Sequence, residues 1–181
     1  MIFKRTGING LYLIEHKKLE DERGFFSRTY CSDVFQTHGF SENFVQFNHS
    51  FNIKRGTIRG LHFQKPPFGE TKLIRCVKGR VFDVAVDLRK GSPTFLKFFG
   101  VELSENSMLS MLIPKGFAHG FQVLENDSAL IYHHTSHYNA EYESGIRYDD
   151  NRINIVWKEP VQVISKRDSN FPSLKQSFTG I

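Results

Sequence analysis

The sequence predicts an all-β fold, a double-sheet jelly roll with one or two short peripheral helices. Residues that favour strands are abundant, notably 18 phenylalanines and 6 tyrosines in a chain of 181 residues. Turn signals recur about every eight to twelve residues, and long segments with helical periodicity are scarce. Because a chain of this length is large enough for one well-packed core and short for two, we expect a single domain over residues 1–181.

The expected strands are short and are separated by turns rich in glycine, proline and asparagine. One short helix is expected over residues 33–38, with Ser32 as its N-cap and Gly39 just beyond its last turn. A hairpin about Gly79 and Arg80 is expected to join two of the strands. In chain order the expected strands cover residues 11–14, a strand ending at Tyr30, 44–52, 57–63, 71–78, 81–88, 94–103, 108–113, 117–123, 129–135, 153–157 and 161–164.

The net charge of +5 favours anionic partners such as nucleotides, sugar phosphates or nucleic acids. Long runs of like charge are missing, and no stacking motif with clustered lysines is evident, so nucleic-acid binding ranks last. Cys31 and Cys76 lack CxxC spacing and are expected to be buried thiols in a reducing compartment. No secretory or transmembrane stretch is evident, which favours a cytoplasmic protein without a membrane partner.

The stretch from Gly56 to Gln64 holds the first candidate for chemistry. Strict alternation along a strand would place His62 on one face and Arg59 on the opposite face. A second histidine, His119, also lies in mid-strand next to a glycine that would let a ligand or another backbone come close. A lone buried histidine is more often a hydrogen-bonded core residue. Two in one small sheet, each near glycine, favour a ligand site.

The residue patterns argue against several kinds of chemistry. No His-x-His occurs, and the adjacent His133 and His134 would point to opposite faces of a strand, so a two-histidine metal site is not expected. No Gly-x-Ser-x-Gly motif is present and neither cysteine has an activating neighbour, which argues against covalent catalysis. Proton transfer remains, and it needs a base, an acid and a group that holds developing negative charge.

Seven short motifs occur in order over most of the chain. They are Asp21-Glu22-Arg23-Gly24-Phe25-Phe26, Arg59-Gly60-Leu61-His62-Phe63-Gln64, Lys72-Leu73, Asp83-Val84-Ala85-Val86-Asp87, Gly116-Phe117-Ala118-His119-Gly120-Phe121, Gly145-Ile146-Arg147 and Ser165-Lys166-Arg167-Asp168. Each motif alone is weak. Together, in register from Asp21 to Pro172, they resemble the dTDP-4-dehydrorhamnose 3,5-epimerase family.

The resemblance implies a cupin-like jelly roll without metal or cofactor, assembled as a homodimer that exchanges N-terminal strands. It also implies epimerisation at C3, C5 or both, beside the C4 ketone of a 4-keto-6-deoxyhexose linked to a nucleotide diphosphate. Such a reaction belongs to deoxysugar and surface-polysaccharide biosynthesis, including the O-antigen of lipopolysaccharide.

The same resemblance assigns catalytic roles. His62 would be the base, Asp168 its carboxylate partner, and Tyr132 the acid that returns a proton from the opposite side of the sugar. Lys72 and His119 are suited to stabilise the enolate. On pattern alone, Tyr132 would be interpreted as an ordinary strand tyrosine and Asp168 as a surface residue.

Further positions are expected to bind the substrate. Arg23 and Arg59 are candidates for the diphosphate, and Phe26 and Tyr138 offer flat surfaces to the nucleobase. The full set of expected substrate-binding residues is Arg23, Phe26, Arg28, Gln46, Asn48, Arg59, Lys72, His119, Tyr138, Glu143 and Arg167.

One departure from the family bears on the nucleobase. Arg28 stands where the family usually has a carboxylate able to accept the N3 hydrogen of thymine, whereas an arginine only donates. Because cytosine presents acceptors at N3 and O2, the alternative is a CDP-linked 4-keto-6-deoxy or 3,6-dideoxy sugar epimerised at a single carbon. An alternative of another class is a non-catalytic carbohydrate-binding cupin. It explains the fold and the arginines but not His62, Asp168 and Tyr132 together.

Overall fold

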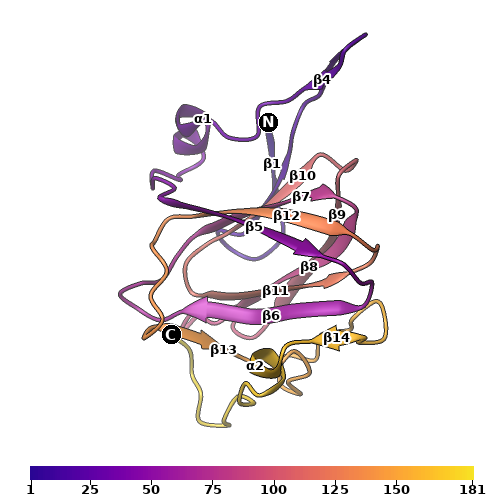
Figure 1. The fold of residues 1–181 in the computed structure, drawn as a ribbon. Helices are drawn as coiled ribbons and strands as arrows, with labels where there is room; N and C mark the ends of the chain where they lie inside the picture. Colours follow the sequence, from indigo (N-terminus) through magenta and orange to yellow (C-terminus); the bar gives the residue numbers. More distant parts are fainter.

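The computed structural model describes residues 1–181 and consists of two stacked β-sheets with short helices at the periphery (Figure 1). The first sheet has the order β1 (Ile2–Arg5), β2 (Tyr12–Glu15), β10 (Leu109–Ile113), β7 (Lys72–Lys78), β12 (Ser128–His134) and β5 (Gln46–Asn52). The second has the order β13 (Glu143–Gly145), β6 (Thr57–Gln64), β11 (Phe117–Val123), β8 (Arg80–Asp87) and β9 (Phe98–Ser104), with β14 (Val163–Ile164) parallel to β6. The helices are α1 (Ser32–Thr37) and α2 (Lys166–Ser169). This architecture confirms the expected double-sheet jelly roll with two short peripheral helices.

Apolar side chains fill the space between the sheets and also cover the outer side of the second one. β8 directs Val81 and Ala85 into the inner core, where they meet residues of the first sheet such as Ile74. The alternate β8 residues, including Val84, point outward but are equally buried, because the chain beyond β13 folds back over them and contributes Ile153. Burial on both faces explains why β8 and β11 are buried along nearly their whole length.

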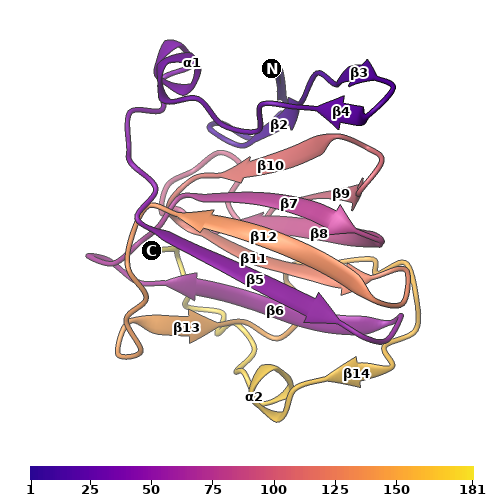
Figure 2. The same ribbon diagram turned by 45° about the horizontal axis from the view of Figure 1, so that its top comes forward.

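A hairpin formed by β3 (Leu19–Asp21) and β4 (Gly24–Phe26) projects from the body of the protein (Figures 1 and 2). The strand expected to end at Tyr30 therefore ends at Phe26 instead. Phe25 and Phe26 are 54% and 66% exposed, so this hairpin contributes nothing to either core of its own chain. Neither helix is long and apolar enough to cross a membrane.

Two of the expected strands, over residues 153–157 and 94–103, differ from the structure. Residues 153–157 form no strand; they pack on the outer side of the second sheet, where the Trp157 indole donates to the Tyr148 carbonyl oxygen at 2.9 Å. The strand expected over 94–103 begins only at Phe98, because residues 94–97 form a turn with Leu96 at φ 62°. In both segments the apolar residues serve packing onto the sheet rather than strand pairing.

Local chain reversals also differ in detail. The expected hairpin at Gly79 does not form: β7 and β8 belong to different sheets, and the turn carries the chain from one to the other. Ser32 is the first residue of α1 rather than its N-cap, which is Cys31 and makes no side-chain capping bond. Gly39, with φ +82°, follows the helix as expected. The short strands β1, β3 and β13 were not expected from the sequence.

A bulge interrupts β6 where the sequence predicted strict alternation. His62 pairs with His119 of β11, whereas Arg59 pairs with Phe121. Between these two pairs β6 advances by three residues and β11 by two, so β6 contains one extra residue. Gly60, at φ +126°, makes this irregularity sterically feasible, because a Cβ there would lie 2.6 Å from the Gly120 Cα. The expectation that Arg59 and His62 lie on opposite faces is therefore wrong.

Candidate active site

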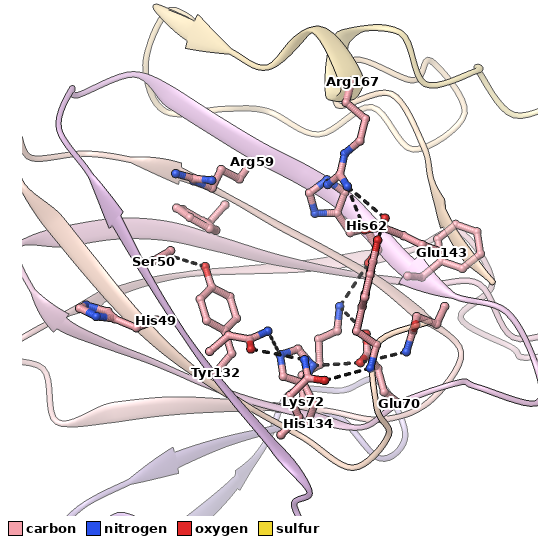
Figure 3. A pocket seen from close by; sticks show the side chains of 16 residues that line it. His49, Ser50, Arg59, His62, Glu70, Lys72, Tyr132, His134, Glu143 and Arg167 are labelled. Atoms are coloured by element: carbon pink, nitrogen blue, oxygen red, sulfur yellow. Dashed lines mark hydrogen bonds and ion pairs between the residues drawn. The ribbon is translucent and has the colours of Figure 1, made fainter. Parts of the chain in front are cut away.

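A cavity of about 310 Å³ opens between the two sheets at the end where β5, β6, β7 and β12 come together (Figure 3). Its walls are mostly polar. Among the residues proposed from the sequence, those that line it are Gln46, Asn48, Arg59, His62, Lys72, Tyr132, Tyr138, Glu143 and Arg167. The other lining residues are His49, Ser50, Phe63, Gln64, Glu70, Phe121 and His134.

His62 and Asp168 form a hydrogen-bonded pair at one wall of the cavity. The Asp168 Oδ1 lies 2.9 Å from the His62 Nε2, and its Oδ2 accepts from the Gly60 backbone N–H at 3.0 Å. Asp168 is held in place because Ser165 caps the one-turn helix α2, accepting from the Asp168 N–H at 3.0 Å. A carboxylate 106 residues away in sequence thus supports the imidazole from behind.

The protonation of this pair follows from the Asp168 carboxylate. Burial alone would raise the pKa of Asp168, but hydrogen bonds from His62 and Gly60 lower it to about 2, so the carboxylate is ionised and only accepts. The His62 Nε2 must therefore carry the proton that it shares with Asp168. The other ring nitrogen, Nδ1, makes no hydrogen bond to the protein and is free to act as a base.

Arg167 lies beside this pair at the rim of the cavity. Its Nη2 is 3.0 Å from the His62 Nε2, but a guanidinium only donates, and that nitrogen already donates to Asp168. Glu143 anchors Arg167 instead, with Nη1 3.1 and 3.0 Å from its two carboxylate oxygens. The Tyr138 hydroxyl donates to the same carboxylate at 2.8 Å, so these three side chains form one hydrogen-bonded network.

Tyr132 faces the cavity from β12, in the opposite sheet from His62 (Figure 3). Its hydroxyl lies 3.0 Å from the Ser50 Oγ, which fixes the phenol direction. Burial raises the pKa of Tyr132 well above its usual value. The phenol therefore keeps its proton at neutral pH, so a proton is available on this side of the cavity for a more basic acceptor.

His119 does not line the cavity. It is 5% exposed, its Nε2 lies 2.8 Å from the Asp83 Oδ1, and its ring packs edge-on against Tyr132 with 6.2 Å between centroids. Burial lowers its pKa, with Asp83 acting in the opposite direction. The structure thus places His119 behind Tyr132, outside the set of residues that line the cavity.

Arg23, Phe26 and Arg28 lie outside the cavity of their own chain. All three are exposed and belong to the projecting β3–β4 hairpin or to the segment that follows it (Figure 2). Arg23 is paired there with Asp21. None of the three lines the cavity of this chain.

Sequence reasoning missed several lining residues. Ser50 follows Gln46 and Asn48 at two-residue steps on β5, so alternation along that strand could have identified it. No sequence signal assigned a role to Glu70 or His134, which meet only in the folded chain. Nowhere do three or more His, Cys, Asp or Glu side chains gather in a way that could hold a metal ion.

Comparisons with known proteins identify the family of this chain. Residues 5–176 match the family model for dTDP-4-dehydrorhamnose 3,5-epimerase. A dTDP-4-dehydrorhamnose 3,5-epimerase from Sinorhizobium fredii is 42% identical over 175 residues, which cover 96% of this chain and 90% of that protein.

Two crystal structures have nearly the same fold. The dTDP-4-dehydrorhamnose 3,5-epimerase of Bacillus anthracis with TDP and PPi bound superposes with a TM-score of 0.93 and 40% identity, covering 96% of this chain and 99% of that one. The dTDP-6-deoxy-D-glucose-3,5-epimerase of Legionella pneumophila in complex with dTDP-4-keto-L-rhamnose gives a TM-score of 0.89 and 40% identity, covering 94% and 90%. The chain therefore belongs to the dTDP-4-dehydrorhamnose 3,5-epimerase family and shares its cupin-like jelly roll.

Proposed function

We propose that this chain, as a single domain over residues 1–181, is an isomerase that epimerises C3 and C5 of a dTDP-linked 4-keto-6-deoxyhexose by proton transfer alone. The observation that carries the proposal is the placement of the His62–Asp168 pair and the Tyr132 phenol on opposite sheets of one cavity. Membership in the family supports the same reaction. We place the enzyme in the cytoplasmic synthesis of deoxysugars for surface polysaccharides such as O-antigen.

The reaction follows from the chemistry of a carbon beside a ketone. The C4 carbonyl acidifies the hydrogens on C3 and C5, and the free Nδ1 of His62 removes one of them. Asp168 stabilises the imidazolium that forms, while the Lys72 ammonium stabilises the negative charge on the enolate oxygen. Tyr132 then gives its proton to the opposite face of the same carbon, which inverts the centre. Solvent water then takes the proton from His62 and returns one to Tyr132, after which the same groups can act at the second carbon.

The nucleotide end of the substrate is assigned to the outer part of the cavity. Because of the bulge, Arg59 lies on the same side as His62, where it can pair with a diphosphate. Its Nε donates to the Asn52 Oδ1 at 2.6 Å and its Nη2 to the Phe51 carbonyl oxygen at 3.5 Å, which leaves Nη1 and the second N–H of Nη2 for the ligand. The TDP and dTDP-sugar ligands of the two neighbouring structures support dTDP as the carrier.

A homodimer that exchanges N-terminal strands would complete this site. The projecting hairpin exposes Phe25 and Phe26 side by side, which is unfavourable in water unless another surface covers them. Inserted into a second subunit, the hairpin would deliver Arg23, Phe26 and Arg28 to that subunit's cavity. Light scattering should report a dimer for the wild type, whereas replacing Phe25 and Phe26 with serine should weaken both dimerisation and dTDP binding. A monomeric wild type that binds dTDP fully would exclude the exchange.

The function is tested by solvent exchange. In D₂O, the wild type acting on dTDP-4-keto-6-deoxyglucose should introduce deuterium at both C3 and C5, read by NMR, whereas His62→Ala should not. His38→Ala, which alters the exposed C-cap histidine that follows α1 away from the cavity, is the matched control and should retain full exchange.

The alternatives give different outcomes in the same assay. Label at one carbon only would indicate a single-site epimerase, and faster exchange on a CDP-linked substrate would favour the interpretation of Arg28 as a cytosine ligand. Binding of dTDP-sugar without any exchange in the wild type would indicate the non-catalytic carbohydrate-binding cupin. Undiminished exchange in His62→Ala would remove that residue from the mechanism.

A further inference from the structure

A buried cluster of opposite charges forms the floor of the cavity. Glu70, Lys72 and His134 have side chains that are each 9% exposed. The Lys72 Nζ lies 3.1 Å from the Glu70 Oε1, and the His134 Nδ1 lies 2.9 Å from the Glu70 Oε2. No other carboxylate lies within 4.0 Å of the Lys72 ammonium. Because a buried ammonium is costly unless it is paired, Glu70 is the group that allows Lys72 to remain charged there.

The position of Glu70 is fixed mainly from the first sheet. His134 of β12 bonds the Glu70 Oε2, and Lys72 of β7 pairs with the Oε1. The next residue along the chain, Thr71, is tied to β12 as well, since its N–H donates to the Thr135 Oγ1 at 2.9 Å. The Gln64 amide of β6 also lies 3.4 Å from the Glu70 Oε2, but its two hydrogens have nearer acceptors in the carbonyl oxygens of Phe68 and His137. The carboxylate is therefore held by groups that come from two strands of the first sheet.

The hydrogen-bond directions along this floor are consistent with a neutral His134. The Gln46 amide donates to the Asn48 Oδ1 at 3.3 Å, so the Asn48 Nδ2 is the atom that faces the His134 Nε2, also at 3.3 Å. That nitrogen must then accept, and Nδ1 carries the proton toward Glu70. Burial would raise the pKa of Glu70, but the bond from His134 and the charge of Lys72 hold it at about 2. Glu70 is thus an ionised acceptor for both neighbours.

The three hydrogens of the Lys72 ammonium can be assigned from these contacts. One is directed to Glu70 and a second to the His62 backbone carbonyl, 3.5 Å away. Lys72 lies on β7 and His62 on β6, so this ammonium connects the two sheets beneath the proposed base. One N–H remains for a ligand, and its direction is set by the two bonds already made.

We propose that Glu70 is a positioning residue for the epimerisation: together with His134 it holds the Lys72 ammonium so that its remaining N–H meets the enolate oxygen. This inference rests on the proposed function. In this proposal Glu70, although it lines the cavity, contributes to the reaction through Lys72. A glutamine at this position could accept from Lys72 or from His134 but would turn its NH₂ toward the other, so it cannot serve both donors.

The test compares Glu70→Gln with wild type in the deuterium-exchange assay. A misdirected ammonium should lower kcat by on the order of 10²-fold while KM and dTDP affinity, measured by calorimetry, stay within about threefold. The matched control is Glu102→Gln, which alters an exposed carboxylate that also forms an ion pair, with Arg80, but lies outside the cavity. This control should retain wild-type kcat.

A double-mutant cycle separates positioning from general damage. In a Lys72→Met background the Glu70→Gln change should cost less than about twofold in kcat, because the group that Glu70 orients is already gone. Equal losses in both backgrounds would overturn the proposal. If Glu70→Gln does not fold, His134→Leu removes the second anchor and should lower kcat in the same direction with dTDP affinity kept; an unchanged kcat in that variant would equally overturn it.

The outcomes also distinguish this inference from the proposed function. If the wild-type protein exchanges no deuterium, the proposed function itself is refuted. If the wild type is active and Glu70→Gln has the same kcat as Glu102→Gln, the proposed function stands and the positioning role of Glu70 is refuted.

Discussion

Replacing Asp168 with asparagine should disable the proposed base without removing any side-chain volume. In the wild type the ionised carboxylate holds the proton of His62 on Nε2 and leaves Nδ1 free. An asparagine would keep its oxygen on the Gly60 N–H and present its NH₂ to His62. Because two donors cannot face each other, the imidazole would then carry its proton on Nδ1, the nitrogen that must accept one from carbon.

The size of the effect has two parts. The pKa of Asp168 falls from 3.8 to about 2, which corresponds to about 2 kcal/mol of stabilisation by its donors, His62 foremost among the interactions that lower it. Losing that amount from the imidazolium alone would slow the reaction roughly 30-fold. The reversed tautomer adds to this loss, and at an aspartate–histidine pair the combined cost reaches on the order of 10⁴-fold. We therefore expect kcat to fall by between roughly 30-fold and 10⁴-fold.

The assay is deuterium exchange at C3 and C5 under saturating substrate, with dTDP affinity measured in parallel. Asp149→Asn is the control, since Asp149 makes two 2.8 Å bonds to Arg147 at an exposed site outside the cavity. It should exchange at the wild-type rate. A loss of less than about tenfold in Asp168→Asn, with folding intact, would refute the assignment of tautomer and base.

Three further outcomes are expected. Tyr132→Phe should still exchange hydrogen at the substrate carbon through His62 but should not invert it, which NMR of the product distinguishes. Gly60→Ala should lower the free energy of unfolding in urea by more than about 3 kcal/mol, because its Cβ would meet backbone at 2.6 Å; Gly39→Ala, with positive φ but no atom within 4 Å, should cost only about 1 kcal/mol. Burial would raise the pKa of Asp87, but bonds from neighbouring arginine, serine and threonine side chains lower it to about 2. Since the folded pKa lies below the unfolded one, Asp87 should add about 2 kcal/mol of stability near pH 7, lost as pH falls from about 4 towards 2, and Asp87→Asn should differ from wild type above that range but not below it.

Sequence patterns were sufficient for the long central strands. β7, β8, β11 and β12 are bracketed by turn residues and rich in strand-forming side chains, and their expected positions agree with the structure within a few residues. Short edge strands such as β13 carry no such pattern, because three residues pair only when tertiary contacts bring them beside β6. Residues 153–157 have the apolar pattern of a strand in the sequence, but in the structure they pack onto the second sheet without pairing with it.

The candidate site was predictable in part. Mid-strand position and neighbouring glycines drew attention to His62 and His119 without any relative. Tyr132 and Asp168 needed the family resemblance, because Asp168 becomes buried only when a one-turn helix docks against β6. The pairing of Glu70 with His134 joins a loop to a strand that is distant in sequence, and no local sequence pattern predicts such a contact.

The bulge in β6 favours the geometry of the site at the expense of regular strand pairing. A regular strand would make more backbone hydrogen bonds to its neighbours and would be more stable. It would also turn Arg59 away from the cavity that His62 lines. Selection for thermal robustness in this enzyme should therefore act on surface loops and leave Gly60 and Gly120 untouched. Any engineered variant that straightens this segment would gain rigidity while losing the alignment of anion ligand and base.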